Sequence, residues 1–239
     1  MSPSQLAKSQ TNSVEKPVAE AAWVRAVNVG KLAPNPAKGG DTAIVKSPTD
    51  HPVFVSAPGP VKGESGLEGD FIGDKKNHGG DDQAVYAFAR EDLDLWEAEL
   101  GFLLPDGAFG ENLTTIGIDP NEARIGERWQ VGPDVLLEVT SPRIPCKTFA
   151  ARIGVVGWAR RFSESGRPGA YLRVLQAGSV GAGDPIIVVR RPAHGVTVSM
   201  ALLAFTIKPQ TLGDLLAAGD DLPEAMRHKI NTKLESRHR

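Results

Sequence analysis

Apolar and polar residues alternate in short runs through most of the chain, and many of the apolar residues are β-branched. Runs of this kind, bounded by turn residues, are typical of short β-strands. Many short strands in succession predict a mainly β fold, a barrel or a sandwich, and not a doubly wound parallel sheet. The predicted strands cover residues 22–29, 42–45, 53–55, 83–88, 112–118, 128–131, 135–140, 171–175 and 186–189.

Helical periodicity replaces this alternation in two places within the same region. Residues 90–100 place Leu93 and Trp96 on one face, and Gly101 follows as a residue suited to a left-handed helix end. Residues 148–165 predict a second helical stretch, broken by internal glycines. The apolar stripe of residues 90–100 is predicted to belong to the core.

The pattern changes after residue 192, where three short helical patterns follow at 198–206, 212–218 and 223–234. About 40 residues bury little surface by themselves, so these helices are expected to dock on the main domain or on a second subunit. Docking on a second subunit would form a homodimer, and the sequence does not decide between these two alternatives. The predicted organisation is a flexible tail over 1–21, a β domain over 22–192 and a small three-helix appendage over 193–239.

Composition excludes several classes of protein. The 27 Lys and Arg residues against 29 Asp and Glu residues leave a net charge of −2, which argues against a nucleic-acid binder. No apolar run approaches the roughly 20 residues that span a bilayer, so no membrane partner is expected. The first 20 residues lack the apolar core of a secretory signal, and the chain has one cysteine. A lone thiol fits a reducing compartment, so we expect a cytoplasmic protein.

The common signature motifs for phosphate loops, dinucleotide binding, serine hydrolases and zinc proteases are missing from the sequence. A single cysteine without paired histidines also argues against structural zinc. The candidate chemistry must therefore come from other polar clusters.

A first cluster combines a histidine with glycines and lysines. His78 is followed by Gly79 and Gly80, and Lys75 and Lys76 precede it closely. Glycines allow the backbone to approach a ligand, and consecutive amides can bind an anion. The alternative interpretation is a solvated turn.

Two further clusters contain single polar candidates. Asn112 lies within the run Phe-Gly-Glu-Asn-Leu and either orients a ligand or satisfies local backbone groups. Arg167 could hold a phosphate or carboxylate, and Tyr171 follows it closely, although a surface loop is the preferred interpretation for either residue alone.

The cysteine lies in the stiffest of these segments. Pro145 fixes the backbone directly before Cys146, and Arg143 and Lys147 flank the thiol with positive charge. Rigid presentation beside cations favours a nucleophile or a metal ligand, whereas a lone cysteine is otherwise most often a small buried hydrophobe.

Taken in order, these motifs resemble one family, the MOSC domain, named for the C-terminal part of molybdenum cofactor sulfurase, and within it the bacterial YiiM-like branch. The runs that carry the resemblance are residues 66–70, 76–80, 109–113 and 142–146, and it extends over about residues 23–191. The C-terminal helices resemble the three-helix appendage of that branch.

The resemblance implies a MOSC-type β-barrel that binds the molybdenum cofactor, a pterin with a metal-holding dithiolene and a phosphate tail. Cys146 matches the cysteine that ligates molybdenum, and His78, Asn112 and Arg143 match residues of the cofactor pocket. Lys76, Gly79 and Gly80 are our additions to that set. Cys146 and His78 are the predicted catalytic residues, with His78 as a proton donor because an unperturbed imidazole titrates near neutrality.

The resemblance also implies a reaction, the reduction of small N-hydroxylated compounds, including hydroxylaminopurine-type base analogues, to amines. No flavin motif is present and one cysteine cannot hold an iron–sulfur cluster, so electrons are expected from a separate reductase, a flavoprotein. The alternative is a non-catalytic carrier of molybdenum cofactor or sulfur.

Overall fold

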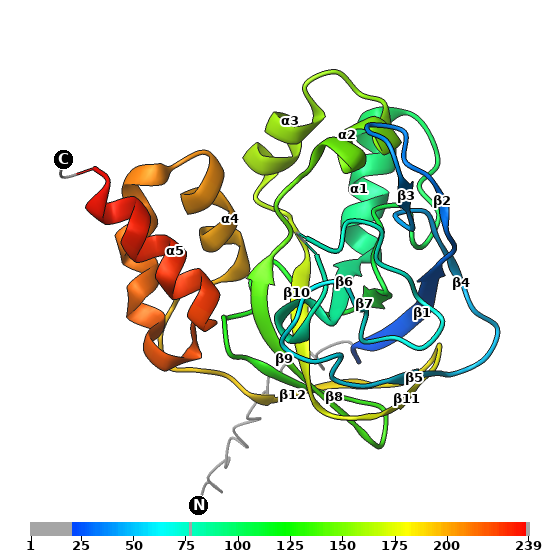
Figure 1. The fold of residues 1–239 in the computed structure, drawn as a ribbon. Helices are drawn as coiled ribbons and strands as arrows, with labels where there is room; N and C mark the ends of the chain where they lie inside the picture. Colours follow the sequence, from blue (N-terminus) through cyan, green and yellow to red (C-terminus); the bar gives the residue numbers. More distant parts are fainter. Residues whose placement is uncertain (1–20, 77, 238–239) are drawn as a thin grey trace, which may run out of the picture.

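The computed structural model describes residues 21–76 and 78–237, and its centre is an eight-stranded sheet (Figure 1). The strand order is β12-β8-β9-β10-β6-β7-β1-β4. Every neighbouring pair is antiparallel except β6 and β7. The strands of this sheet are β1 (Trp23–Gly30), β4 (Lys46–Pro48), β6 (Val85–Ala89), β7 (Leu113–Ile116), β8 (Arg128–Val131), β9 (Val135–Pro142), β10 (Ala170–Gln176) and β12 (Ile186–Arg190).

Four shorter strands form two ladders beside the main sheet. They are β2 (Ala33–Pro34) with β3 (Asp41–Thr42), and β5 (Val53–Val55) with β11 (Gly178–Val180). Seven helical elements complete the described chain: η1 (Asp81–Gln83), α1 (Arg90–Leu100), α2 (Lys147–Ile153), α3 (Trp158–Ser165), α4 (Val198–Thr206), the long 3-10 element η2 (Pro209–Asp221) and α5 (Glu224–Glu235). In this part of the chain no helix has the length and apolar character needed to cross a bilayer.

The main sheet is not closed into a barrel, so the barrel prediction is not confirmed. Its edge strands β12 and β4 do not pair with each other. The segment before β12 meets β1 at a single bridge, Trp23 with Pro185, and the Val24 amide donates to the Asp184 carbonyl at 2.9 Å. The Gly183 amide also donates to the Val24 carbonyl at 2.8 Å and the Ile186 amide to the Ala22 carbonyl at 2.8 Å, but no continuous ladder joins β12 to β1. The sheet-dominated class with several helices is correct.

The strand predicted over 42–45 is wrong beyond its first residue. Pairing ends at Thr42, whose hydroxyl accepts a hydrogen bond from the Ile44 amide at 3.2 Å. A local bond of this type competes with the sheet ladder. The chain turns there, and Ala43 and Ile44 line a pocket instead.

The helical stretch predicted over 148–165 is two helices, as its internal glycines indicate. Gly154 ends α2 with φ +73°, and Gly157 precedes α3 with φ +72°. The helix predicted over 212–218 is instead part of the 3-10 element η2, which contains a non-helical residue at Gly219. Glycine favours neither helix type strongly, so the tertiary contacts decide between them.

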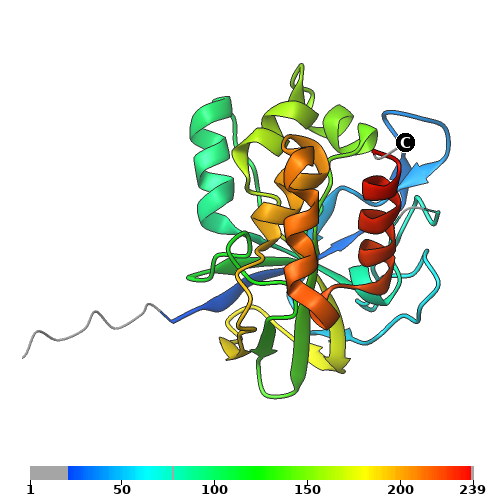
Figure 2. The same cartoon turned by 90° about the vertical axis from the view of Figure 1, so that its left-hand side faces the viewer.

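Two apolar cores lie on opposite sides of the sheet. The larger core joins sheet residues such as Trp129 and Leu137 to residues of the C-terminal helices such as Ala201 and Leu215. Figure 2 shows these helices (orange to red) standing side by side in front of the sheet, and α4 contacts β9. The helices therefore dock on the main domain of the same chain. The predicted boundaries at 192 and 193 stay a prediction, and the predicted tail lies outside the described residues except for residue 21.

The second core is an aromatic cluster under α1, α2 and α3. Trp96 and Trp158 meet edge to face with ring centroids 4.8 Å apart, and Phe149 meets Phe109 at 5.2 Å and Phe162 at 5.0 Å. Edge-to-face pairs contribute roughly 0.5–1.5 kcal/mol each beyond area burial. Because Phe149 belongs to α2, this cluster fixes the helix that begins after Cys146.

Two glycines with the same backbone conformation provide a matched test of how tightly β10 packs on β6. A Cβ at Gly169 (φ +66°) would lie 2.5 Å from the Ala87 carbonyl oxygen, whereas a Cβ at Gly154 (φ +73°) would meet nothing within 4 Å. Gly154→Ala should cost about 1–2 kcal/mol of unfolding free energy, from backbone strain alone. Gly169→Ala should cost about 1–3 kcal/mol more, because the strands must also move apart. Urea unfolding measures both, and equal losses would contradict this packing.

Candidate functional site

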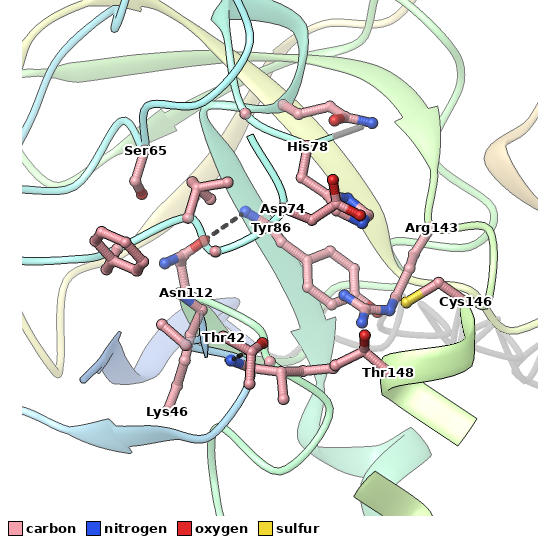
Figure 3. A pocket seen from close by; sticks show the side chains of 18 of the residues that line it. Thr42, Lys46, Ser65, Asp74, His78, Tyr86, Asn112, Arg143, Cys146 and Thr148 are labelled. Atoms are coloured by element: carbon pink, nitrogen blue, oxygen red, sulfur yellow. Dashed lines mark hydrogen bonds between the residues drawn. The ribbon is translucent and has the colours of Figure 1, made fainter. Parts of the chain in front are cut away.

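One pocket collects most of the residues singled out from the sequence. It lies where the chain between β2 and β4, the loop before η1, and the ends of β6 and β9 meet (Figure 3). Its empty volume, the open mouth included, is about 670 Å³, within the range of small-molecule sites. The lining residues are Asn35, Thr42, Ala43, Ile44, Lys46, Ser65, Phe71, Ile72, Gly73, Asp74, His78, Gly79, Gln83, Tyr86, Gly110, Asn112, Arg143, Cys146, Thr148 and Tyr171.

Arg143 is a buried cation in this pocket and has no acidic partner. It follows β9 directly and is 6% exposed. Its guanidinium carbon lies 4.5 Å from the centroid of the Phe149 ring and 5.1 Å from that of the Tyr86 ring. In the described part of the chain no carboxylate lies within 4.0 Å of it, and its Nε is buried without a hydrogen-bond partner. A buried charge without a counter-ion is costly, so the site favours an anionic ligand.

Cys146 is half-buried and faces the same pocket. It is the N-cap of α2, where its Sγ accepts a hydrogen bond from the Phe149 amide at 3.5 Å. Figure 3 shows its sulfur pointing toward the Arg143 guanidinium. The segment thus presents the thiol to solvent-accessible space beside a cation, and the buried-hydrophobe alternative does not describe it.

Asp70 organises the opposite wall of the pocket. Its carboxylate accepts hydrogen bonds from the Gly30 amide at 2.7 Å, the Ser65 hydroxyl at 2.7 Å and the Asn112 amide nitrogen at 3.0 Å. It also forms a buried ion pair with Lys46. Burial lowers the pKa of Lys46, and Asp70 acts in the opposite direction. The aspartate therefore holds a second buried cation against the pocket.

Asn112 has its amide group engaged by the protein. Its Oδ1 accepts from the Tyr86 amide at 3.1 Å, and its Nδ2 donates to Asp70 at 3.0 Å and to the Asn28 carbonyl at 3.4 Å. These bonds favour the interpretation in which the asparagine satisfies neighbouring groups. Asn112 lines the pocket, as the predicted cofactor contacts require, but its amide N–H donors already bond to other protein groups.

His78 lines the pocket, and its surroundings change its expected chemistry. Burial, and after it the positive charge of Arg143, lower its pKa to about 4. The imidazole is therefore neutral at neutral pH. The predicted role as proton donor assumed an unperturbed pKa, and that premise is wrong for this structure.

Of the other three predicted cofactor contacts, one lines the pocket and two do not. Gly79 lines the pocket with φ +79°. Gly80 does not line it, and its amide donates to the Glu64 carbonyl at 3.1 Å, so it is not available to an anion. Lys76 is exposed and lies outside the lining.

Several lining residues were not predicted from the sequence. Lys46 and Asp70 come together across 24 positions, and only the isolated lysine at the end of an apolar run could have drawn attention to itself. Tyr171, for which a surface loop was preferred, is buried in β10 with its ring 5.0 Å from that of Tyr86. Arg167 is exposed and lies 3.6 Å from Asp92, as a surface loop predicts.

A buried carboxyl group supports the loop that carries Gly110. Glu111 is fully buried and accepts hydrogen bonds from the Gly107 amide at 2.6 Å, the Phe109 amide at 3.0 Å and the Thr114 hydroxyl at 3.0 Å. Burial raises its pKa to about 7 despite these bonds. Within the described residues no three His, Cys, Asp or Glu side chains gather in a way that would hold a metal ion.

Fold and site together define a sheet-based domain with a small-molecule pocket that combines one thiol with two buried cations. The model of the MOSC domain matches residues 74–187, and the relatives described next match most of the chain. The chain belongs to the MOSC domain family.

Its relatives include proteins named YflK and YiiM. The chain is 32% identical over 161 residues to the uncharacterized protein YflK of Bacillus subtilis, covering 67% of this chain and 69% of the relative. It is 31% identical over 185 residues to YiiM of Escherichia coli, covering 75% and 77%. A Gibberella moniliformis protein named "Reductase" is 36% identical over 161 residues, which cover 65% of this chain but only 27% of that protein.

Solved structures agree with the sequence relatives. The crystal structure of YiiM from Geobacillus stearothermophilus superposes with a TM-score of 0.71 at 25% identity, covering 89% of this chain and 99% of the other. YiiM from Escherichia coli gives a TM-score of 0.65 at 23% identity, covering 88% and 91%, and shows the shared fold.

Glu111 predicts a measurable dependence of stability on pH. In the folded chain the Glu111 carboxyl keeps its proton up to about pH 7. In the unfolded chain it loses this proton near its ordinary pKa of 4.5. The folded state therefore binds more protons in this window, and its stability falls as pH rises. The unfolding free energy of the protein minus that of Glu111→Gln should decline by roughly 3 kcal/mol between these pH values.

This difference isolates Glu111, because His78, with its lowered pKa, gives the opposite slope in both proteins. Urea unfolding at a series of pH values measures it, with replacement of the exposed Glu122 by Gln as the control. A pH-independent difference between the protein and Glu111→Gln would show that the carboxyl does not titrate in this way.

Proposed function

We propose that this protein binds the molybdenum cofactor and reduces small N-hydroxylated compounds to amines. The observation that carries the proposal is the joint presence in one pocket of a thiol and a buried guanidinium without an acidic partner. A soft thiolate is a suitable ligand for molybdenum, and fixed cations suit the anionic dithiolene and phosphate of the cofactor. The relative named "Reductase" supports an oxidoreductase class.

The residues present fit such a cofactor. Cys146 would ligate the metal, and Arg143 would offset negative charge of the pterin dithiolene and phosphate, whereas the charge of Lys46 is already balanced by Asp70. The unpartnered Nε of Arg143 is a donor that a bound anion could satisfy. When bound, the cofactor supplies the two-electron chemistry that removes an oxygen atom from the substrate.

The reaction balances with two electrons and two protons. The N–O bond of the hydroxylamine breaks, and an amine and water are released. His78 is too weak a base to be protonated in the structure as it stands, with its pKa near 4. An anion beside Arg143 would cancel part of the positive field and raise that pKa, so a ring nitrogen of His78 could then hold and deliver a proton. Phe71, which lines the pocket, offers a flat apolar wall for a planar base analogue.

The second candidate function is a carrier of cofactor or sulfur without turnover. The specific observation in its favour is the neutral imidazole, because a neutral imidazole is a poor proton donor for the bond cleavage that turnover requires. Both functions use the same pocket, so reactivity and not binding separates them.

Turnover by the loaded protein is the first test. Protein made in a host that synthesises the cofactor should contain molybdenum, and with reduced methyl viologen it should convert 6-hydroxylaminopurine to adenine. Elemental analysis and chromatography of the purine measure the two outcomes. Molybdenum without turnover, over several N-hydroxylated substrates, would assign the carrier function instead. Protein without molybdenum would refute the reductase and the cofactor carrier.

Replacement of the cysteine tests the metal ligand. Cys146→Ser should lose most of the bound molybdenum while unfolding like the parent protein, because serine is a good N-cap but a poor ligand for a soft metal. Thr148→Ser, in the same pocket, should keep its metal and serves as the control. An unchanged molybdenum content in Cys146→Ser would mean that the thiol does not bind the metal.

A further inference from the structure

The segment that carries the thiol is unusually basic. Residues 143–167 contain six Lys and Arg residues against one carboxylate, in a chain whose net charge is −2. Two carboxylates of α1 pair with it, since Glu99 lies 2.6 Å from Arg161 and Asp92 lies 3.6 Å from Arg167. Arg160 pairs with Glu164 of the same helix at 2.7 Å, and Arg143 is buried in the pocket, so the exposed surplus is two positive charges, Lys147 and Arg152. Among the described residues neither Lys147 nor Arg152, both exposed, has a carboxylate within 4.0 Å.

The extended residues 143–146 separate two different surfaces. Arg143 and Cys146 line the cofactor pocket, whereas Ile144 and Pro145 line an open groove on the other side. The pocket and this groove share no lining residue. A partner in the groove would thus be separated from the thiol by the thickness of one backbone segment, while the mouth of the pocket stays free for substrate.

The groove has an apolar centre and a charged edge. It is lined by residues 144–145, by residues of α3 and by the end of α4, and Figure 1 shows α3 at the top of the molecule and α4 on its left side. Ile144 is 39% exposed and Ile207 is 37% exposed. Such a composition is typical of protein interfaces. The lining residues are Ile144, Pro145, Ala159, Arg160, Ser163, Glu164, Thr206 and Ile207.

We propose that this groove and the basic surface around it dock an acidic electron-carrier protein with an exposed flavin edge. The inference rests on the proposed function, whose reaction consumes two electrons that the reduced flavin of the partner supplies. The apolar edge of a flavin fits the Ile144 and Ile207 surface, and an acidic rim is attracted by the surplus positive charge. Complementary charge raises the association rate, as a transient electron-transfer complex requires.

Binding to a flavodoxin, an acidic protein that carries FMN, tests the docking surface directly. Calorimetry should detect a complex at about 20 mM salt that weakens at least about tenfold at about 300 mM, because salt screens exposed charges. Arg160→Glu should weaken it about fivefold or more at low salt. Ala159→Asp should also weaken it, since this exposed α3 residue lines the groove.

Lys233→Glu, an equal charge change on the exposed face of α5, is the matched control and should leave binding within about twofold of the parent protein. Equal effects of Arg160→Glu and Lys233→Glu, or binding that does not respond to salt, would overturn the proposal. Salt-resistant self-association of the protein that Ala159→Asp abolishes would assign the groove to a second copy of this chain and would also overturn it.

Turnover separates this proposal from the proposed function. In the molybdenum-loaded protein, Arg160→Glu should lower kcat/KM for reduced flavodoxin about fivefold at low salt and leave turnover with reduced methyl viologen unchanged, because that small donor needs no docking surface. Loss of turnover with both donors in the parent protein would refute the reductase function, whereas the calorimetry would still decide the docking surface. Equal losses with both donors in Arg160→Glu would show damage to the site and contradict the docking role.

Discussion

The buried guanidinium of Arg143 is the constraint on which the site depends. It lies between the Phe149 and Tyr86 rings, is almost entirely removed from solvent and has no carboxylate partner among the described residues. Cation–π contacts offset only part of the cost of burying a charge. On the proposed function, an anion entering the pocket would neutralise this fixed positive field and offset the remaining cost. Burial, together with the same field, keeps the His78 imidazole neutral at neutral pH.

Two buried carboxyl groups hold the geometry around this cation without cancelling it. Asp70 gathers Lys46, Ser65, Asn112 and the Gly30 amide into one wall. Glu111 does the same for the loop that ends at Gly110, through the Gly107 and Phe109 amides. Each acid satisfies donors that would otherwise be buried and unpaired, so the walls of the pocket are fixed before a ligand arrives.

The aromatic cluster connects this polar site to stability and to the outer surface. Phe149 packs beneath Arg143 and also against Phe109 and Phe162, so the first turn of α2 and the thiol before it belong to a rigid unit. On the outside of that unit the chain presents a basic surface and an apolar groove. Residues 143–146 thus contribute to both the pocket and the groove, because neighbouring residues of an extended chain point in different directions.

Sequence alone determined the sheet-dominated class, most strand positions, the breaks at the glycines and the family, because alternation, glycine placement and motif order are local properties of the chain. It also identified Cys146, Arg143 and His78 as neighbours. Tertiary structure decided the rest: that the sheet stays open, that Lys46 and Asp70 join the pocket, that Tyr171 is buried, and that Gly80 and Lys76 do not line it. The tertiary structure also set the charge state of His78. Burial and the positive charge of Arg143, which is far away in the sequence, lower its pKa, and no local pattern in the sequence shows which segments meet in space.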